Sequence, residues 1–140
     1  MVYTSYFGKW RKINGWVFPV SIVRYKPEWF GGPNYSKLAP PSDLLMEWKN
    51  DPCNDDYFGI KRRQYNEAVL DKLDVHQVAK ELEEMLPYKL HEKLKGKSVF
   101  ESQRAHIVLL CFEKPCDFCH RHFVAQWLTK NGYKCEEAYL

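Results

Sequence analysis

The sequence predicts an α/β domain, in which a small parallel or mixed sheet is flanked by helices in three layers. Residues 105–112 form a continuous apolar run of strand length, which is typical of a strand buried on both faces. A helical pattern and then a second short strand-like segment follow this run, and strand–helix–strand is the unit of parallel sheets. The 140 residues are enough for one domain, 1–140, with its own core.

Two strands are expected near the start of the chain. Residues 2–7 are rich in aromatic and β-branched side chains. Residues 16–25 have a similar composition, and Pro19 indicates that the regular strand begins only after it. Residues 26–41 then contain four prolines and two adjacent glycines, so we expect a long loop, and such loops are often functional.

The middle of the chain is predicted to be helical. Ser42 can cap a short helix that runs through residue 49, and residues 60–73 form a second candidate. Asp74 caps a third helix, whose apolar residues keep helical spacing until Pro87. The last helix is expected over residues 118–131 with Asp117 as its cap, followed by a strand at 133–137.

Composition and charge limit the function classes. The net charge of +3 is too small to indicate nucleic acid by itself, but residues 1–37 combine an excess of basic residues with many aromatic ones. Such a combination can hold phosphates and stack on bases, although the aromatic residues can equally form the core. No apolar run reaches the roughly 18 residues of a membrane span, and no signal-peptide pattern begins the chain. We therefore expect a cytoplasmic protein with no membrane partner.

The candidate site lies where the buried strand ends and the last helix begins. Ligands of α/β sheets bind beyond the carboxyl ends of the strands, and the free N–H groups at a helix start favour anions and lower the pKa of a thiol. Cys111 ends the strand, whereas Cys119 and His120 are expected in the first turn of the helix. Arg121 adds a cationic fork that fits phosphate or carboxylate. This pattern predicts an anion site.

The expected ligand is a nucleotide or a nucleic-acid phosphate. In an enzymatic version, His120 is the general acid or base and Cys119 or Cys111 is the nucleophile. Glu113 could orient the histidine, pair with the arginine or act as a base. Lys26 and Tyr35 in the proline-rich loop are candidates to reach over the pocket.

Three alternatives remain open from the residues alone. Zinc could be bound through Cys111, Cys116, Cys119 and Cys135, with His120 or His122 also available. Against this, no second CxxC pair is present, and the adjacent Cys119 and His120 cannot easily ligate the same ion. The same CxxC pair could act in redox chemistry. In the third alternative the protein is a non-enzymatic interaction module, whose Cys-His-Arg cluster is structural or binds zinc and whose aromatic N-terminal region binds another protein.

The segment LLCFEKPCDFCHRHFVAQWL resembles the signature of a bacterial and phage family, domain of unknown function 488. The matching residues are Leu109, Leu110, Cys111, Glu113, Cys119, His120 and Arg121. The segments YTSYF, SIVRYKPEWFGG and LAPPSDLLMEWK are similar to further blocks of a shorter branch of this family. The resemblance implies a compact α/β domain, with the C-x-E…CHR group as its functional centre. A host protein is the partner that the interaction-module alternative would have. Cys116 lies outside that pattern.

Overall fold

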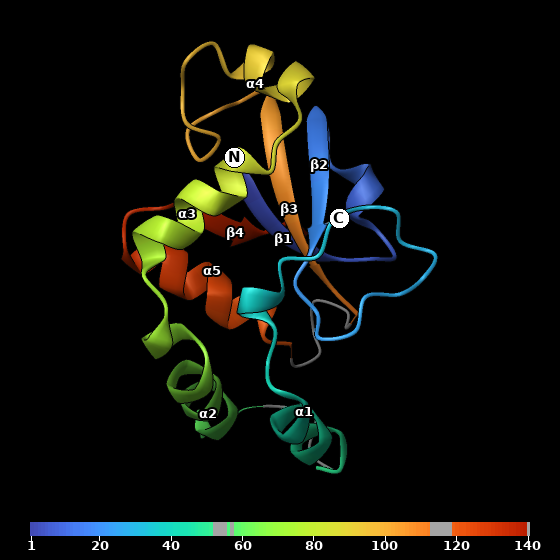
Figure 1. Ribbon diagram of the computed structural model, residues 1–140, viewed down its shortest axis with the longest axis vertical. Coiled ribbons are helices and arrows are strands. Elements are labelled where there is room, and N and C mark those ends of the chain that lie inside the picture. The colour runs from blue at the N-terminus through green and yellow to red at the C-terminus, as the bar shows by residue number, and fades with distance from the viewer. Residues whose placement is uncertain (52–55, 57, 113–118, 140) are drawn as a thin grey trace.

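The computed structural model describes residues 1–51, 56, 58–112 and 119–139, and within them the sheet has four strands in the order β2-β3-β1-β4 (Figure 1). The strands are β1 (Val2–Tyr6), β2 (Trp16–Ser21), β3 (Ala105–Cys111) and β4 (Cys135–Glu137). All three pairings between neighbouring strands are parallel. The α/β class and the parallel sheet predicted from the sequence are confirmed.

The two faces of the sheet are covered differently. Val2, Ile107 and Leu109 face the main core, which also contains the apolar side chains of the helices. Val108 and Leu110 face the other way and pack against Phe30 and other aromatic side chains. In the described part of the chain this third layer is thin, because a 3-10 turn at Trp10–Lys12 and loops form it in place of an α-helix.

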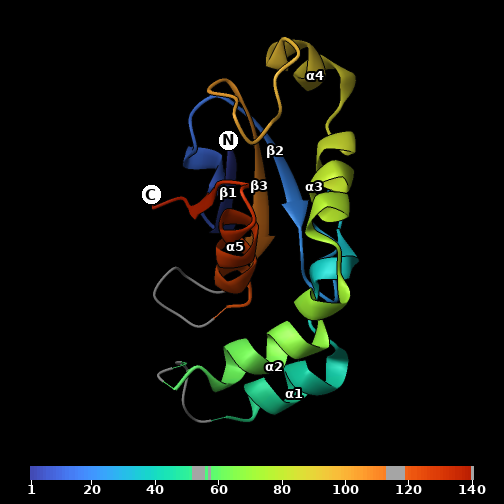
Figure 2. The same cartoon turned by 90° about the vertical axis from the view of Figure 1, so that its left-hand side faces the viewer.

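Five α-helices are described: α1 (Ser42–Lys49), α2 (Ile60–Ala68), α3 (Val75–Glu84), α4 (Tyr88–Leu94) and α5 (Arg121–Lys130). Figure 2 shows α1 and α2 together beyond the carboxyl ends of the strands, whereas α4 lies at the opposite end. The predicted cap of α3 is confirmed, because the Asp74 carboxylate accepts a hydrogen bond from the backbone N–H of His76 at 3.0 Å. None of the described helices is both long and apolar enough to pass through a membrane.

The structure corrects several predicted boundaries. β2 begins at Trp16, before Pro19, because β2 lies at the edge of the sheet, where the missing N–H of a proline need not cost a bond of the ladder. It ends at Ser21, four residues earlier than expected. Ser42 is the first residue of α1 and not its cap. α5 begins at Arg121, and its expected cap, Asp117, lies outside the described residues.

Candidate functional site

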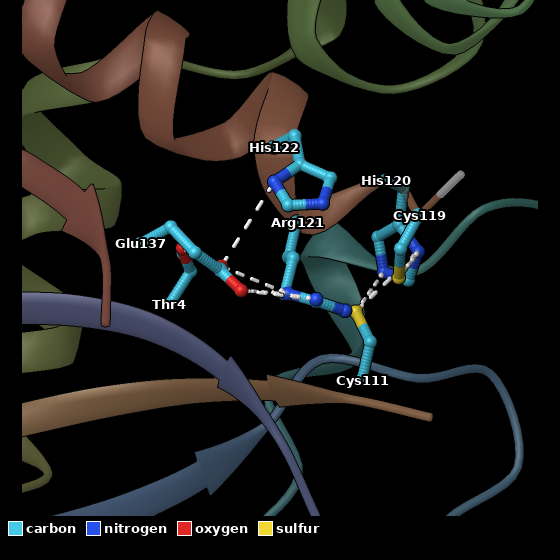
Figure 3. Close-up of polar contacts among 7 residues, drawn as sticks. All are labelled: Thr4, Cys111, Cys119, His120, Arg121, His122 and Glu137. Atoms are coloured by element: carbon cyan, nitrogen blue, oxygen red, sulfur yellow. Dashed lines mark hydrogen bonds and ion pairs between the residues drawn. The ribbon is translucent and has the colours of Figure 1, made fainter. Parts of the chain in front are cut away.

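Cys111, Cys119 and His120 meet in the main core at the carboxyl end of β3 (Figure 3). The Nδ1 atom of His120 lies 3.7 Å from the sulfur of Cys111 and 3.8 Å from that of Cys119. One ligating atom from each of the three side chains lies within 4.8 Å of the others. β3 supplies Cys111, and the two residues that precede α5 supply the others. The expectation that Cys119 and His120 lie in the first turn of the helix is wrong, because α5 begins at Arg121 and His120 is its cap residue.

The orientation of the His120 ring is determined by a backbone carbonyl. Nε2 of His120 lies 2.7 Å from the carbonyl oxygen of Ile22, the first residue after β2. A carbonyl oxygen only accepts hydrogen bonds, so Nε2 carries the hydrogen and donates it. In a neutral imidazole the other nitrogen, Nδ1, then has a lone pair, and both sulfurs lie within 3.8 Å of this nitrogen, although the sulfur of Cys111 is equally far, 3.7 Å, from Nε2. The site therefore presents two thiols and one basic nitrogen to each other.

Arg121 is fully buried and is paired with Glu137 of β4. Its Nε and Nη2 atoms each lie 3.0 Å from a carboxylate oxygen of Glu137, whose side chain is only 6% exposed. Thr4 donates a further hydrogen bond to the same carboxylate at 2.7 Å. Figure 3 shows the guanidinium between Glu137 and Cys111. The Arg121 guanidinium, which was predicted to bind the phosphate of a ligand, instead binds the carboxylate of Glu137 in the protein itself.

Burial dominates the acid–base behaviour of these groups. It raises the pKa of the Cys119 thiol well above its ordinary value, and the smaller effect of the neighbouring His120 does not reverse this. The sequence-based expectation of a lowered thiol pKa is therefore wrong, because the side chain is only 3% exposed. Burial alone would lower the pKa of Arg121, but the hydrogen bonds to Glu137 and the nearby thiols raise it.

A pocket of about 330 Å³ opens onto the cluster. Its lining combines the two cysteines and the histidine with Arg24, Lys49 and several apolar and aromatic side chains. These apolar and aromatic residues are Val23, Tyr25, Pro40, Leu45, Trp48 and Phe112. Of the described residues that line the pocket, none is acidic. The volume is within the range of small-molecule sites, and the lining offers cations, ring faces and thiols together.

The structure separates other predicted site residues from this pocket. Glu113 and Cys116 lie outside the described residues. Lys26 donates to the carbonyl oxygen of Gly32, and Tyr35 donates to Glu81; neither is among the described residues that line the pocket.

Cys135 is also remote from the cluster. It is in register with Val2, whereas Cys111 is in register with Tyr6, four residues further along β1. At roughly 3.3 Å per residue this places the two cysteines about 13 Å apart along the strands, and β1 lies between them. Cys135 therefore cannot share a metal ion with Cys111, as the zinc hypothesis had allowed.

The sequence-based reasoning missed the two cations of the pocket. Arg24 follows the end of β2, and the rule that ligands bind beyond strand ends could have identified it. Lys49 is the last residue of α1, and no sequence rule of this kind would have identified it as a pocket residue. Glu137 was also missed, because nothing in the sequence relates it to Arg121.

No protein-family model matches the chain, and no curated protein or solved structure is significantly similar to it.

Proposed function

We propose that the pocket binds an anionic ligand with a planar ring, such as a nucleotide or a nucleotide unit of a nucleic acid. The observation that supports this most directly is the joint lining of one pocket by Arg24, Lys49 and aromatic side chains. Two cations without an acidic neighbour among the described lining residues favour a negative ligand. Ring faces of Tyr25, Trp48 or Phe112 can stack on a base.

Arg24 is already positioned for this role. Its Nε and Nη2 atoms donate to the carbonyl oxygens of Pro40 and Ala39 at 3.0 and 3.1 Å, so its guanidinium is fixed at one wall of the pocket. A guanidinium fixed in this way loses little side-chain entropy when it contacts a phosphate. Lys49 is exposed and adds a more mobile charge. Arg121 has a positioning role in this proposal, because Glu137 occupies its fork.

An enzymatic version of the function uses the thiols at the base of the pocket. Nδ1 of His120 is the nitrogen that can accept a proton from Cys111 or Cys119, since Nε2 already donates to Ile22. The resulting imidazolium keeps that hydrogen bond. The raised pKa of Cys119 means that this residue is a thiol before ligand binds.

Titration with AMP, inorganic phosphate and a short single-stranded oligonucleotide, followed by tryptophan fluorescence, tests the proposal. We expect AMP to bind, and Lys49→Gln to weaken it about two- to fivefold, because an exposed charge pair contributes only about 0.5–1 kcal/mol. Lys80→Gln is the matched control: Lys80 is also exposed and on a helix, but it does not line the pocket. The proposal fails if none of the three probes binds, or if both variants weaken binding equally.

A second candidate function, a protein-interaction module, is favoured by an exposed aromatic strip. The ring of Phe7 contacts those of Trp29 and Phe112, each with centroids 5.2 Å apart, and Trp29 is 69% exposed. Exposed tryptophans of this kind are frequent in protein-binding hot spots. Trp29→Ala would abolish binding of a partner protein in this case, while leaving AMP titration unchanged.

A further inference from the structure

We propose that Cys111, Cys119 and His120 form a binding site for a thiophilic metal ion such as Zn²⁺, with one coordination position directed into the pocket. The inference does not depend on the proposed nucleotide-like ligand. It is carried by the convergence of two sulfurs and one imidazole nitrogen in a buried cluster that a pocket reaches. Sulfur and imidazole donors select zinc or copper(I) over magnesium or calcium.

Two of the distances within the cluster are close to those of a metal-bound set, and the three ligand atoms lie within 4.8 Å of one another. With Zn–S bonds of about 2.3 Å and Zn–N bonds of about 2.05 Å, tetrahedral angles place a sulfur and a nitrogen ligand about 3.6 Å apart. The two N···S distances are 3.7 and 3.8 Å. These two N···S separations are therefore close to those of a metal-bound set, whereas the sulfur of Cys111, which is also 3.7 Å from Nε2, would have to turn toward the Nδ1 side of the ring to bind the ion.

The surroundings of His120 are those of a metal ligand. Its Nε2–H donates to the Ile22 carbonyl at 2.7 Å, and a hydrogen bond of this kind to the second ring nitrogen commonly orients a ligating histidine. Nδ1 is the nitrogen left to bind the ion, and both sulfurs lie within 3.8 Å of it. The bond to Ile22 thus sets both the tautomer and the direction of the lone pair.

The charges also balance at the site. Two thiolates neutralise one Zn²⁺, and the neutral imidazole adds no charge. Arg121 stands close enough to both sulfurs to interact electrostatically with them, while Glu137 compensates its own charge. A buried site can therefore be loaded without leaving an unpaired charge in the core. Three protein ligands and an open position are the arrangement of zinc sites that bind exchangeable groups.

Cobalt(II), which reports its ligands by absorption, tests the site on the full chain. We expect one equivalent of Co²⁺ to give a thiolate charge-transfer band and the visible bands of a tetrahedral ion, and one equivalent of Zn²⁺ to displace it. Cys119→Ser should weaken binding by about 100-fold or more, because each ligand carries a large share of the affinity. Cys135→Ser is the matched control, since this cysteine is also buried but lies at a distant place in the sheet.

A second measurement needs no variant and so remains decisive if Cys119→Ser does not fold. Zinc added to the unbuffered wild-type protein near neutral pH should release at least one proton per bound ion, because the buried Cys119 thiol, whose pKa is raised, must lose its proton to bind the metal. Release of fewer than about one proton per ion, or no binding of Zn²⁺ or Co²⁺ at micromolar concentration, overturns the proposal. An unchanged cobalt spectrum in folded Cys119→Ser also overturns it.

Discussion

Replacing Arg121 distinguishes a structural arginine from a ligand clamp. In Arg121→Met the carboxylate of Glu137 stays buried, and of the described residues Thr4 and His122 remain as its weaker side-chain partners. Removing one partner of a buried ion pair costs about 3–5 kcal/mol, since the other charge is left uncompensated. The Arg121–Glu137 pair is a buried ion pair of this kind, because Arg121 is completely buried and makes two contacts of 3.0 Å with the carboxylate.

Urea unfolding followed by tryptophan fluorescence measures the effect. A loss of that size lowers the unfolding midpoint by about 2 M, given a slope of roughly 1–3 kcal/mol per molar urea. The double variant Arg121→Met/Glu137→Leu should recover most of the loss, because it removes both charges from the core. Lys80→Met serves as a control: it breaks the exposed pair with Glu84, at 3.9 Å, and should change stability by less than about 0.5 kcal/mol.

The reasoning is refuted if Arg121→Met is within about 1 kcal/mol of the wild-type stability. It is also refuted if the double variant is no more stable than the single one. If Arg121→Met is stable but no longer binds AMP, Arg121 binds the ligand directly, as its sequence position first indicated.

Two further predictions concern the core. Tyr65→Phe should lower the free energy of unfolding by about 1–3 kcal/mol in urea titrations, because the buried Leu38 carbonyl would lose the 2.6 Å hydrogen bond from the Tyr65 hydroxyl. An unchanged free energy of unfolding would contradict this. Burial lowers the pKa of His106 below its ordinary 6.5, so the unfolded state takes up the proton first and stability should fall as the pH drops below about 6.5. His106→Phe keeps the ring packed near Tyr3 and should reduce this dependence in thermal melts at pH 7 and 5; an unchanged dependence would assign it to other groups.

The sequence predicted the parts of the fold that depend on local patterns. The apolar run at β3 and the helical spacing of α3 are strong periodic signals, and Asp74 has a local partner that defines its cap. Pro19 misled the prediction, because whether a proline can stay in a strand depends on the strand's place in the sheet. The thin third layer was missed for a related reason, since aromatic loop residues have no periodicity that distinguishes them from a surface.

The position of the candidate site could be predicted, but not the state of its groups. Cys111, Cys119 and His120 lie close in the sequence, and the strand-to-helix connection brings them together. The pairing of Arg121 with Glu137 depends on β4 lying beside β1, which is a property of the topology. The raised pKa of Cys119 depends on burial, and the dipole argument alone gave the opposite sign.

The adjacent residues His120 and Arg121 hold opposite edges of the sheet. His120 donates to the carbonyl oxygen of Ile22, just beyond β2, and Arg121 pairs with Glu137 in β4. The two outermost strands of the sheet are therefore joined through two consecutive residues. β4 has only three residues, and the Arg121 pair adds to the bonds that Thr129 makes with Cys135 and Thr4 with Glu137. The start of α5 therefore connects the two edge strands of the sheet. A displacement of its first residues by a bound ion or ligand would loosen both margins of the sheet together, and faster amide exchange in β4 would report events in a pocket that β4 does not line.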